Sequence, residues 1–322
     1  MDTLEMAMVF METTNVTCQE ILYMNPRAGK YIRCSYSEED LPYISLTTAI
    51  SGNNFYIGTE EPKGTDHLAV LEYSHAGNVW QRANMSTFQK PDMSRKSEID
   101  EFLLEVDEIL YYVFVERENI STSVWIRKYN RHTDQWQECS QLKIRMPNYL
   151  RNHSYHTVVS CGPHIYFLMK PQMHRYDPSQ DRWCKLTPPK LEFCTTVAMG
   201  TEIFCTDREF SKTMVYDTKS DRWQVRQGWP NPRPVNLDNT ILPYFFVLEN
   251  QLHVWVEAFT ISSLQTTNNL VYVYDKFTDT WRDLEATMPS GEYLTPDSSL
   301  PVACMYLPCL TAKGTDLSTA CL

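Results

Sequence analysis

Long apolar runs are missing from this sequence of 322 residues. No stretch approaches the roughly eighteen consecutive apolar residues that a membrane-spanning helix needs. The first dozen residues carry Asp2, Glu5 and Glu12, whereas a secretory signal begins with a basic segment and continues with an apolar one. The sequence therefore predicts a protein that is neither exported nor held in a membrane. We expect it in the cytoplasm, with the nucleus as an alternative location.

The sequence also has fewer basic than acidic residues. The chain has 29 lysine and arginine residues against 40 aspartate and glutamate residues, which gives a formal net charge of −11. Proteins that bind nucleic acid or anionic lipid surfaces need clustered basic side chains for their phosphate contacts. The composition therefore indicates that neither nucleic acid nor a membrane is the main partner.

Motifs of catalytic and metal-binding sites are absent as well. The 10 cysteines form no CxxC pair, and the sequence contains no HExxH, no GxSxG and no glycine-rich phosphate loop. The eight histidines are dispersed, and the densest group, His153, His156, His164 and His174, shows no metal-ligand spacing to a cysteine or glutamate. We therefore expect reduced thiols, no metal, no cofactor and no catalytic residue.

One pattern does recur through the whole chain. A tyrosine and a turn-forming residue end an apolar segment, and a tryptophan follows after five more residues. The tryptophans stand 56, 47, 40 and 58 residues apart, which suits a repeat of about 50 residues with loops of variable length. The copies are Tyr73 with Trp80, Tyr129 with Trp136, Tyr176 with Trp183, Tyr216 with Trp223, Tyr274 with Trp281 and, more weakly, Met24-Asn25 with Tyr31.

We interpret each copy as the outer hairpin of a four-stranded sheet, because two further apolar strands precede it. The tryptophan ring is expected to cover the interface with a neighbouring sheet and to donate its indole N–H to a backbone carbonyl. Six sheets predict an all-β, six-bladed β-propeller over residues 1–310, with a tail at 311–322. The first sheet lacks its innermost strand, which the segment 300–307 is predicted to supply, closing the ring. The predicted hairpins lie near 20–36, 69–85, 124–140, 173–187, 213–227 and 270–285.

The repeated hairpin resembles the kelch repeat over almost the entire chain. Kelch units usually carry a Gly-Gly pair at the end of their second strand. Here only Gly58 lies near such a place, and the chain has 10 glycines in all. The sequence is therefore similar to a diverged kelch propeller, with its departures expected at strand ends and loops.

Many such propellers form the carboxyl-terminal half of BTB-kelch proteins, which are substrate receptors of cullin-3 ubiquitin ligases. This chain starts inside a blade with no BTB or BACK segment ahead of it, and so resembles an excised half. The resemblance implies a non-catalytic substrate-recognition domain, with cullin-3 as a partner through a BTB domain absent from this chain. Two alternatives stay open: a non-degradative scaffold in a cytoskeletal or trafficking complex, and a propeller-fold oxidase whose copper site uses tyrosine, histidine and a Tyr-Cys crosslink.

The resemblance also places substrate binding on one face, where the blade-to-blade connections and the second-to-third-strand connections emerge. The blade-to-blade connections are long at 85–97, 143–154 and 228–239, and loops of this length are often functional. Basic residues outnumber acidic ones in the loops after the second to fifth sheets, which predicts attraction of an acidic or phosphorylated segment of a substrate protein. A solvated rim without a partner is the alternative.

The candidate binding residues on this face are basic side chains and loop aromatics. An exposed loop aromatic is a candidate hot spot, although each ring, Phe88 included, can instead pack back on its own blade. Lys90, Lys143, Lys190 and Lys212 add to the basic character of the same connections. The predicted set is Arg95, Lys96, Arg117, Arg145, Tyr149, Arg151, His153, Lys170, Arg208, Phe210, Trp229, Arg233, Phe259 and Tyr293.

Overall fold

The computed structural model is built from β-strands, and the residues that it describes contain no helix. Nothing in this described part is therefore a helix long and apolar enough to cross a membrane. The described residues are 3–12, 18–37, 44–51, 54–60, 67–74, 79–90, 98–118, 121–145, 155–207, 210–230, 239–260, 265–285, 295–296 and 303–308.

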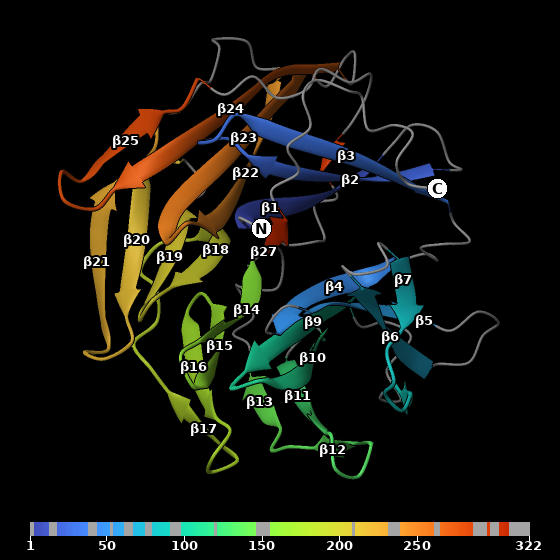
Figure 1. The fold of residues 1–322 in the computed structure, drawn as a ribbon. Coiled ribbons are helices and arrows are strands. Elements are labelled where there is room, and N and C mark those ends of the chain that lie inside the picture. Colours follow the sequence, from blue (N-terminus) through green and yellow to red (C-terminus); the bar gives the residue numbers. More distant parts are fainter. Residues whose placement is uncertain are drawn as a thin grey trace.

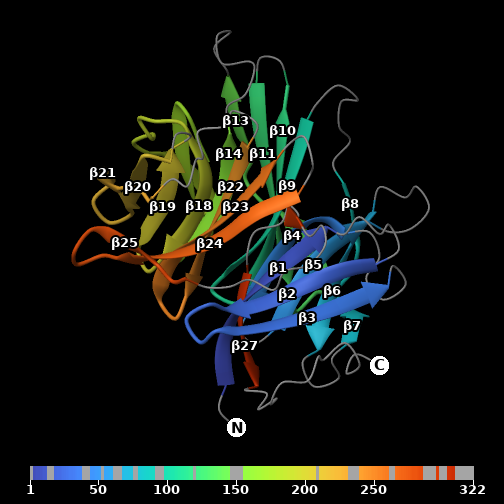
Figure 2. The same ribbon diagram turned by 90° about the horizontal axis from the view of Figure 1, so that it is seen from above.

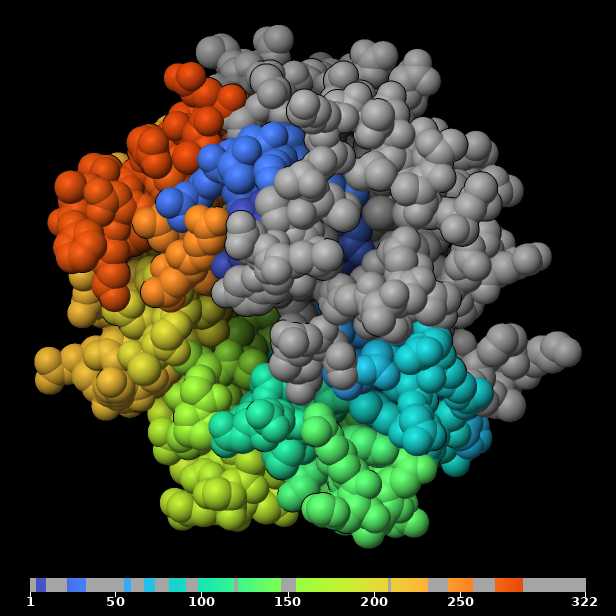
Figure 3. Space-filling view, in the orientation of Figure 1, coloured from blue at the N-terminus to red at the C-terminus, as the bar shows by residue number. Residues whose placement is uncertain are grey.

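Six antiparallel sheets stand around a common axis (Figure 1). Each sheet has four or five strands, and the view turned by 90° shows the same sheets from above (Figure 2). In the space-filling view, the described parts of successive sheets form a continuous band from cyan through green and yellow to orange (Figure 3). The predicted six-bladed β-propeller is therefore confirmed.

In five of the sheets, blades 2 to 6, four strands follow chain order from the axis to the rim (Figure 1). Blade 2 contains β4 (Ile44–Ser51), β5 (Asn54–Glu60), β6 (His67–Ser74), β7 (Val79–Arg82) and a short β8 (Phe88–Gln89) on β6. Blade 3 contains β9 (Glu98–Val106), β10 (Ile109–Arg117), β11 (Ser121–Asn130), β12 (Gln135–Glu138) and a short β13 (Leu142–Arg145) on β11.

The next three blades have four strands each. Blade 4 contains β14 (His156–Cys161), β15 (His164–Met169), β16 (Gln172–Asp177) and β17 (Arg182–Lys185). Blade 5 contains β18 (Phe193–Met199), β19 (Glu202–Asp207), β20 (Lys212–Asp217) and β21 (Arg222–Gln227). Blade 6 contains β22 (Asn239–Leu248), β23 (Gln251–Thr260), β24 (Gln265–Asp275) and β25 (Thr280–Asp283).

Blade 1 joins the two ends of the chain. Its strands are β27 (Ala303–Pro308), β1 (Thr3–Glu12), β2 (Cys18–Asn25) and β3 (Lys30–Ser37), and the short β26 (Thr295–Pro296) also pairs with β1. β27 runs antiparallel to β1, with Met305 opposite Met6 and Ala303 opposite Met8 (Figure 2). The predicted closing strand is thus confirmed. The tail at 311–322 lies outside the described residues, and the domain boundary at 310 stays a prediction.

The hydrophobic core lies in layers between neighbouring blades. Between blades 3 and 4, for example, Val113 and Ile126 belong to the same buried cluster as Ile165 and Phe167. Similar clusters join blades 2 and 3, 4 and 5, 5 and 6, and 6 and 1. Because each blade buries its apolar faces against its neighbours, closing the ring protects surfaces that a single sheet would leave in water.

The third-to-fourth-strand hairpins turn around an aspartate or asparagine side chain, as predicted. In blade 4, Asp177 Oδ1 accepts hydrogen bonds from the Ser179 amide at 3.0 Å and from its hydroxyl at 2.7 Å. In blade 6, Asp275 Oδ1 accepts a hydrogen bond from the Phe277 amide at 2.8 Å. The corresponding amides in blades 3 and 5 donate in the same way. All four turns therefore use the side chain at the first position and the backbone amide two positions later, and in blade 4 the Ser179 hydroxyl adds a second hydrogen bond.

In blades 3 to 6, the repeat tryptophan fastens its blade to the one before it, which confirms the predicted role for these four residues. Each of these indole N–H groups donates a hydrogen bond of 2.7 to 2.9 Å to a carbonyl at or just after the end of the outer strand of the preceding blade. The pairs are Trp136 with Ser86, Trp183 with Ser140, Trp223 with Thr187 and Trp281 with Gln227.

An aspartate completes each of these attachments, and the sequence interpretation did not identify it. It stands five residues after the repeat tyrosine and accepts a hydrogen bond of 2.7 Å from the hydroxyl group of that tyrosine. It also accepts a hydrogen bond from a backbone amide of the preceding blade, that of the residue whose carbonyl accepts the indole N–H. These aspartates are Asp134, Asp181, Asp221 and Asp279, all with φ between 46° and 55°. The sequence does contain a signal for this position, because Gly29 and Asn78 stand at the same place in the other two repeats. Glycine, asparagine and aspartate are the residue types that tolerate a positive φ, so their recurrence here indicates that backbone conformation. We call each Tyr-Asp-Trp set a clasp.

Candidate partner-binding surface

Each face of the ring carries two kinds of connection, because consecutive antiparallel strands alternate in direction. The loop face carries the blade-to-blade and second-to-third-strand connections. Its described part includes the starts of the inner strands at Glu98 and Tyr155 and the connection at Lys170. The turn face, on the opposite side, carries the first-to-second and third-to-fourth-strand turns, among them the turn at Phe277.

Four of the predicted basic residues lie exposed in the described part of the loop-face connections: Lys143, Arg145, Lys190 and Lys212. Lys143 and Arg145 flank the buried Ile144 in β13, so both side chains leave the same side of this strand. β13 pairs with the first residues of β11, directly after a second-to-third-strand connection. Among the described residues neither side chain has an ion-pair partner, so they form an unpaired basic edge.

Other predicted basic residues are paired with carboxylates. Lys90 Nζ lies 2.7 Å from Glu101 Oε1, and both side chains are largely buried. Lys170 Nζ lies 4.0 Å from Glu192 Oε1, with both side chains partly exposed. The positive charge on this face is therefore smaller than the count of basic residues predicts, and within the described ranges no carboxylate is paired with the basic edge on β13.

Arg117 belongs to a chain of charged groups near the start of the inner strands. Its Nη2 lies 2.8 Å from Glu98 Oε2 and 3.5 Å from Asp100 Oδ2, and His156 Nε2 lies 3.1 Å from the same Asp100 oxygen. Burial alone raises the pKa of Asp100, but the hydrogen bond and charge of His156 and the charge of Arg117 outweigh it and lower this pKa. The predicted addition of Arg117 to a basic surface is thus corrected, since two carboxylates surround it.

Two exposed apolar side chains stand beside this charged chain and were not predicted. Ile99 is 39% exposed and Tyr155 is 43% exposed, and they directly precede Asp100 and His156 in the sequence. The Tyr155 ring meets Phe193 of blade 5 edge-on, with centroids 5.3 Å apart. Ile99 is the second residue of the inner strand β9, and Tyr155 directly precedes the inner strand β14.

The loop aromatics that the structure describes pack inward. Phe88, Phe210 and Trp229 are 7%, 8% and 2% exposed, and the Phe210 and Trp229 rings are 5.0 Å apart. The alternative that such rings pack back on the blades is therefore confirmed for these three, and the expectation of exposed hot spots at Phe210 and Trp229 is wrong. Phe259 lies within β23 and not in a loop.

The burial of Trp229 has a cause in the backbone. A Cβ atom at Gly228 would come within 2.3 Å of the Ser211 carbonyl carbon, so only glycine allows this close approach. The connection that contains Ser211 is held in turn by Asp207, whose carboxylate accepts hydrogen bonds from the Ser211 hydroxyl at 2.8 Å and from the Lys212 amide at 2.9 Å. Two connections of blade 5 therefore lock together and draw the indole into the core.

The remaining predicted site residues lie outside the described residues, and their roles stay predictions. They are Arg95, Lys96, Tyr149, Arg151, His153, Arg208, Arg233 and Tyr293.

The structure brings no metal-binding set together within its described ranges. No three histidine, cysteine, aspartate or glutamate side chains there converge on one point. His156 lies beside Asp100, whereas burial and, secondarily, the charge of Lys185 lower the pKa of His174 to about 4. In the described structure, His156 therefore contacts a carboxylate and His174 is packed in the interior.

Known proteins provide an independent comparison. No family model matches the chain. Kelch repeat and BTB domain-containing protein 8 of Xenopus tropicalis is 24% identical over 196 aligned residues, covering 56% of this chain and 30% of that protein. The human protein of the same name is 21% identical over 320 aligned residues, covering 92% of this chain and 49% of that protein. The chain thus spans about half or less of the length of the relatives that it matches.

A solved structure supports the fold alone. A protein from Lactobacillus plantarum superposes with a TM-score of 0.53 at 10% identity, covering 95% of this chain and 100% of that one. The chain has six blades, with tyrosine-tryptophan hairpins in every blade but a weaker first, and it is similar to kelch repeat and BTB domain-containing protein 8. Together these findings fit a β-propeller fold of the kelch type.

Proposed function

We propose that this propeller is the substrate-recognition domain of an adaptor for a cullin-3 ubiquitin ligase, and that it binds its substrate through the loop face. The kelch-type fold and the similarity to kelch repeat and BTB domain-containing proteins support a protein-interaction module. In the proposed assembly, a BTB domain outside this chain binds cullin-3. The propeller binds a substrate protein and contributes no catalytic group.

The unpaired basic edge of β13 is the observation that carries the assignment of the face. In a protein of net charge −11, Lys143 and Arg145 project together from the loop-face end of blade 3 without a carboxylate partner among the described residues. A local positive edge on a net-acidic protein attracts an acidic or phosphorylated segment and disfavours other partners. The exposed Ile99 and Tyr155 supply apolar contact area on the same face.

The test reverses this charge in the full-length protein. With Lys143→Glu and Arg145→Glu, we expect proteins that accumulate when the adaptor is removed to lose their association with it. Cullin-3 co-precipitation should be unaffected, because the BTB contact is elsewhere. The thermal midpoint should change little, because exposed charges contribute little to folding.

A matched control lies on the opposite face of the same blade. Arg131 is exposed in the third-to-fourth-strand turn, and Arg131→Glu should leave substrate binding unchanged. Unaltered binding by the double variant contradicts the assignment of the face. Stable partners whose abundance does not respond to removal of the protein, with no cullin-3 in the complex, contradict the ligase role and favour the scaffold.

A further inference from the structure

A cleft opens on the turn face at the seam between blades 5 and 6, opposite to the proposed substrate surface. Its volume is about 730 Å³, and its walls come from the first-to-second-strand turns and the third-to-fourth-strand hairpins of both blades. Buried Leu252, Val273 and Tyr274 contribute apolar lining. The cleft therefore combines an apolar interior with a polar rim, as ligand sites commonly do.

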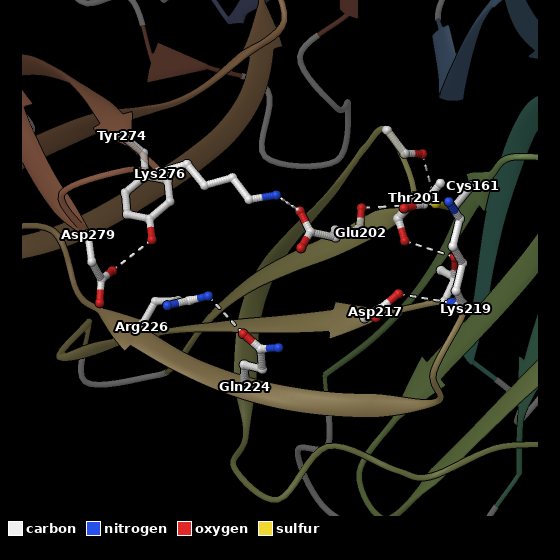
Figure 4. Close-up of polar contacts among 12 residues, drawn as sticks. Cys161, Thr201, Glu202, Asp217, Lys219, Gln224, Arg226, Tyr274, Lys276 and Asp279 are labelled. Carbon is white, nitrogen blue, oxygen red and sulfur yellow. Dashed lines mark hydrogen bonds and ion pairs between the residues drawn. The ribbon is translucent and has the colours of Figure 1, made fainter.

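Ion pairing and turn formation occupy the carboxylates in the cleft walls. Lys276 of blade 6 pairs with Glu202 of blade 5 across the seam (Figure 4). Asp217 accepts hydrogen bonds from the Lys219 amide at 3.0 Å and the Ser220 hydroxyl at 2.7 Å. Asp275 likewise accepts the amides of its own turn. These acidic groups are therefore held by donors of the protein itself.

Two cations of the walls have no ion-pair partner in the part of the chain that the structure describes, although the hydrogen bond from Ser220 and, to a smaller extent, the charge of Lys219 lower the pKa of Asp217. Among the described residues, neither the Lys219 ammonium group nor the Arg282 guanidinium group forms an ion pair, although both line the cleft. A ligand that brings a carboxylate satisfies them. The net charge of −11 repels a long polyanion such as nucleic acid, whereas these local cations can still attract a short acidic segment placed next to them.

Phe277 at the rim of the cleft is 102% exposed. The turn needs only the amide of this residue, which donates to Asp275 Oδ1, and the equivalent amides of Ser179, Lys219 and His132 do the same in their own blades. Nothing in the fold therefore requires a phenyl ring here. An aromatic side chain presented to water beside a cleft is a contact residue of the kind that dominates protein interfaces.

We propose that this cleft binds an extended acidic peptide segment of a partner protein, with its carboxylate on Lys219 and Arg282 and an apolar side chain against Phe277. This site is distinct from the substrate surface on the loop face. It would let the propeller hold a second protein at the same time as a substrate.

The experiment uses short random peptides displayed on phage, selected on the intact protein and then synthesised with a fluorescent label. The recovered peptides should combine aspartate or glutamate with an aromatic or aliphatic residue. Phe277→Ser should weaken their binding by at least about tenfold, the loss typical of a hot-spot residue. Lys219→Glu with Arg282→Glu should also weaken it and invert its salt dependence, because salt then screens a repulsion in place of an attraction.

Three controls make the result specific. His132→Ser changes the equivalent turn position in blade 3 and should leave binding unaltered, as should the loop-face pair Lys143→Glu with Arg145→Glu. Phe277→Ser should melt at the temperature of the unaltered protein, because Ser179 already supports the same turn in blade 4. Peptide binding on the turn face is thus measured separately from substrate binding on the loop face.

Other outcomes overturn the proposal. These are failure to recover any peptide, recovery of peptides without acidic residues, and undiminished binding by Phe277→Ser. Sedimentation that shows a dimer converted to a monomer by Phe277→Ser would assign the cleft to a second copy of this chain instead.

Discussion

At the scale of the residue, the clasp aspartate connects two blades through one carboxyl group. Asp181 accepts hydrogen bonds of 2.7 Å from both the Tyr176 hydroxyl and the Ser140 amide. Burial alone raises the pKa of Asp181, but these hydrogen bonds outweigh it and lower this pKa below its ordinary value. The ionised carboxylate is thus the form that fastens blade 4 to blade 3.

Removing this carboxylate should lower the free energy of unfolding. Asp181→Gly introduces a residue that adopts the φ of 46° without strain, as Gly29 does at the same place in blade 1. The substitution therefore removes the hydrogen bonds of the carboxylate without straining the backbone. We expect a loss of about 1 kcal/mol in urea denaturation at neutral pH. The difference should shrink as pH falls below about 4, toward the lowered pKa. Equal stability of the two proteins at neutral pH would show that the clasp contributes nothing.

His253 should make the protein sensitive to mild acid. It has no exposed surface and its ring stacks on Phe246, and burial lowers its pKa to about 4. Between the unfolded pKa of about 6.5 and this value, only the unfolded chain takes up the proton, so stability falls as pH falls. We expect His253→Phe to reduce the decrease in unfolding free energy between pH 6.5 and 4 by at most about 3 kcal/mol. An unchanged slope in thermal melts across this range contradicts the assignment.

At the scale of the element, the contact between Gly228 and Ser211 fixes how two connections of blade 5 cross. Gly228→Ala should displace one of them, and we expect it to destabilise the protein by about 1–3 kcal/mol, as overpacking does. Gly162 is the matched control, because nothing lies within 4 Å of the place where its Cβ would be. Gly162→Ala should carry only the smaller cost of its φ of 57°. Equal melting temperatures of the two variants would argue against the close contact.

The hairpins were predictable and the connections were not, for reasons that these elements make clear. The turn at Asp177 is determined by residues next to one another in the sequence. By contrast, β13 forms inside a segment predicted as loop because Ile144 finds a buried place against its neighbours. Trp229 is drawn inward by a contact with a connection that precedes it in the chain. The conformation of such segments depends on tertiary packing, which the local sequence pattern does not reveal.

The candidate sites show the same division. Exposure of Arg145 could be predicted from its place in a segment expected to be a loop, whereas the ion pairing of Arg117 could not, because Glu98 and Asp100 come from another strand. Phe277 was accessible from the sequence in principle. Aligning the six turns places it where Arg27, Ala76, His132, Ser179 and Lys219 stand, and an aromatic at a position that the turn leaves free indicates contact rather than folding.

At the scale of the whole molecule, the ring depends on a strand from the far end of the chain. Met6, Ala7, Met8 and Val9 of β1 are at most 3% exposed, and β27 pairs with β1 over six residues, from Thr3 to Met8. Without β27, the inner edge of blade 1 has unpaired backbone groups. The first and sixth blades share a buried cluster, so damage to blade 1 reaches its neighbour.

Two truncations separate this strand from the residues beyond it. A chain that ends at Val302 lacks β27, and a chain that ends at Cys309 retains it. We expect the shorter chain to lose cooperative unfolding and to aggregate through the open edge of β1, because a propeller without its closing strand cannot bury its first blade. The longer chain should melt as the full chain does. Thermal unfolding followed by circular dichroism, with size-exclusion chromatography for aggregation, measures both, and a shorter chain that is as stable and monodisperse as the longer one would mean that the ring does not need its closing strand.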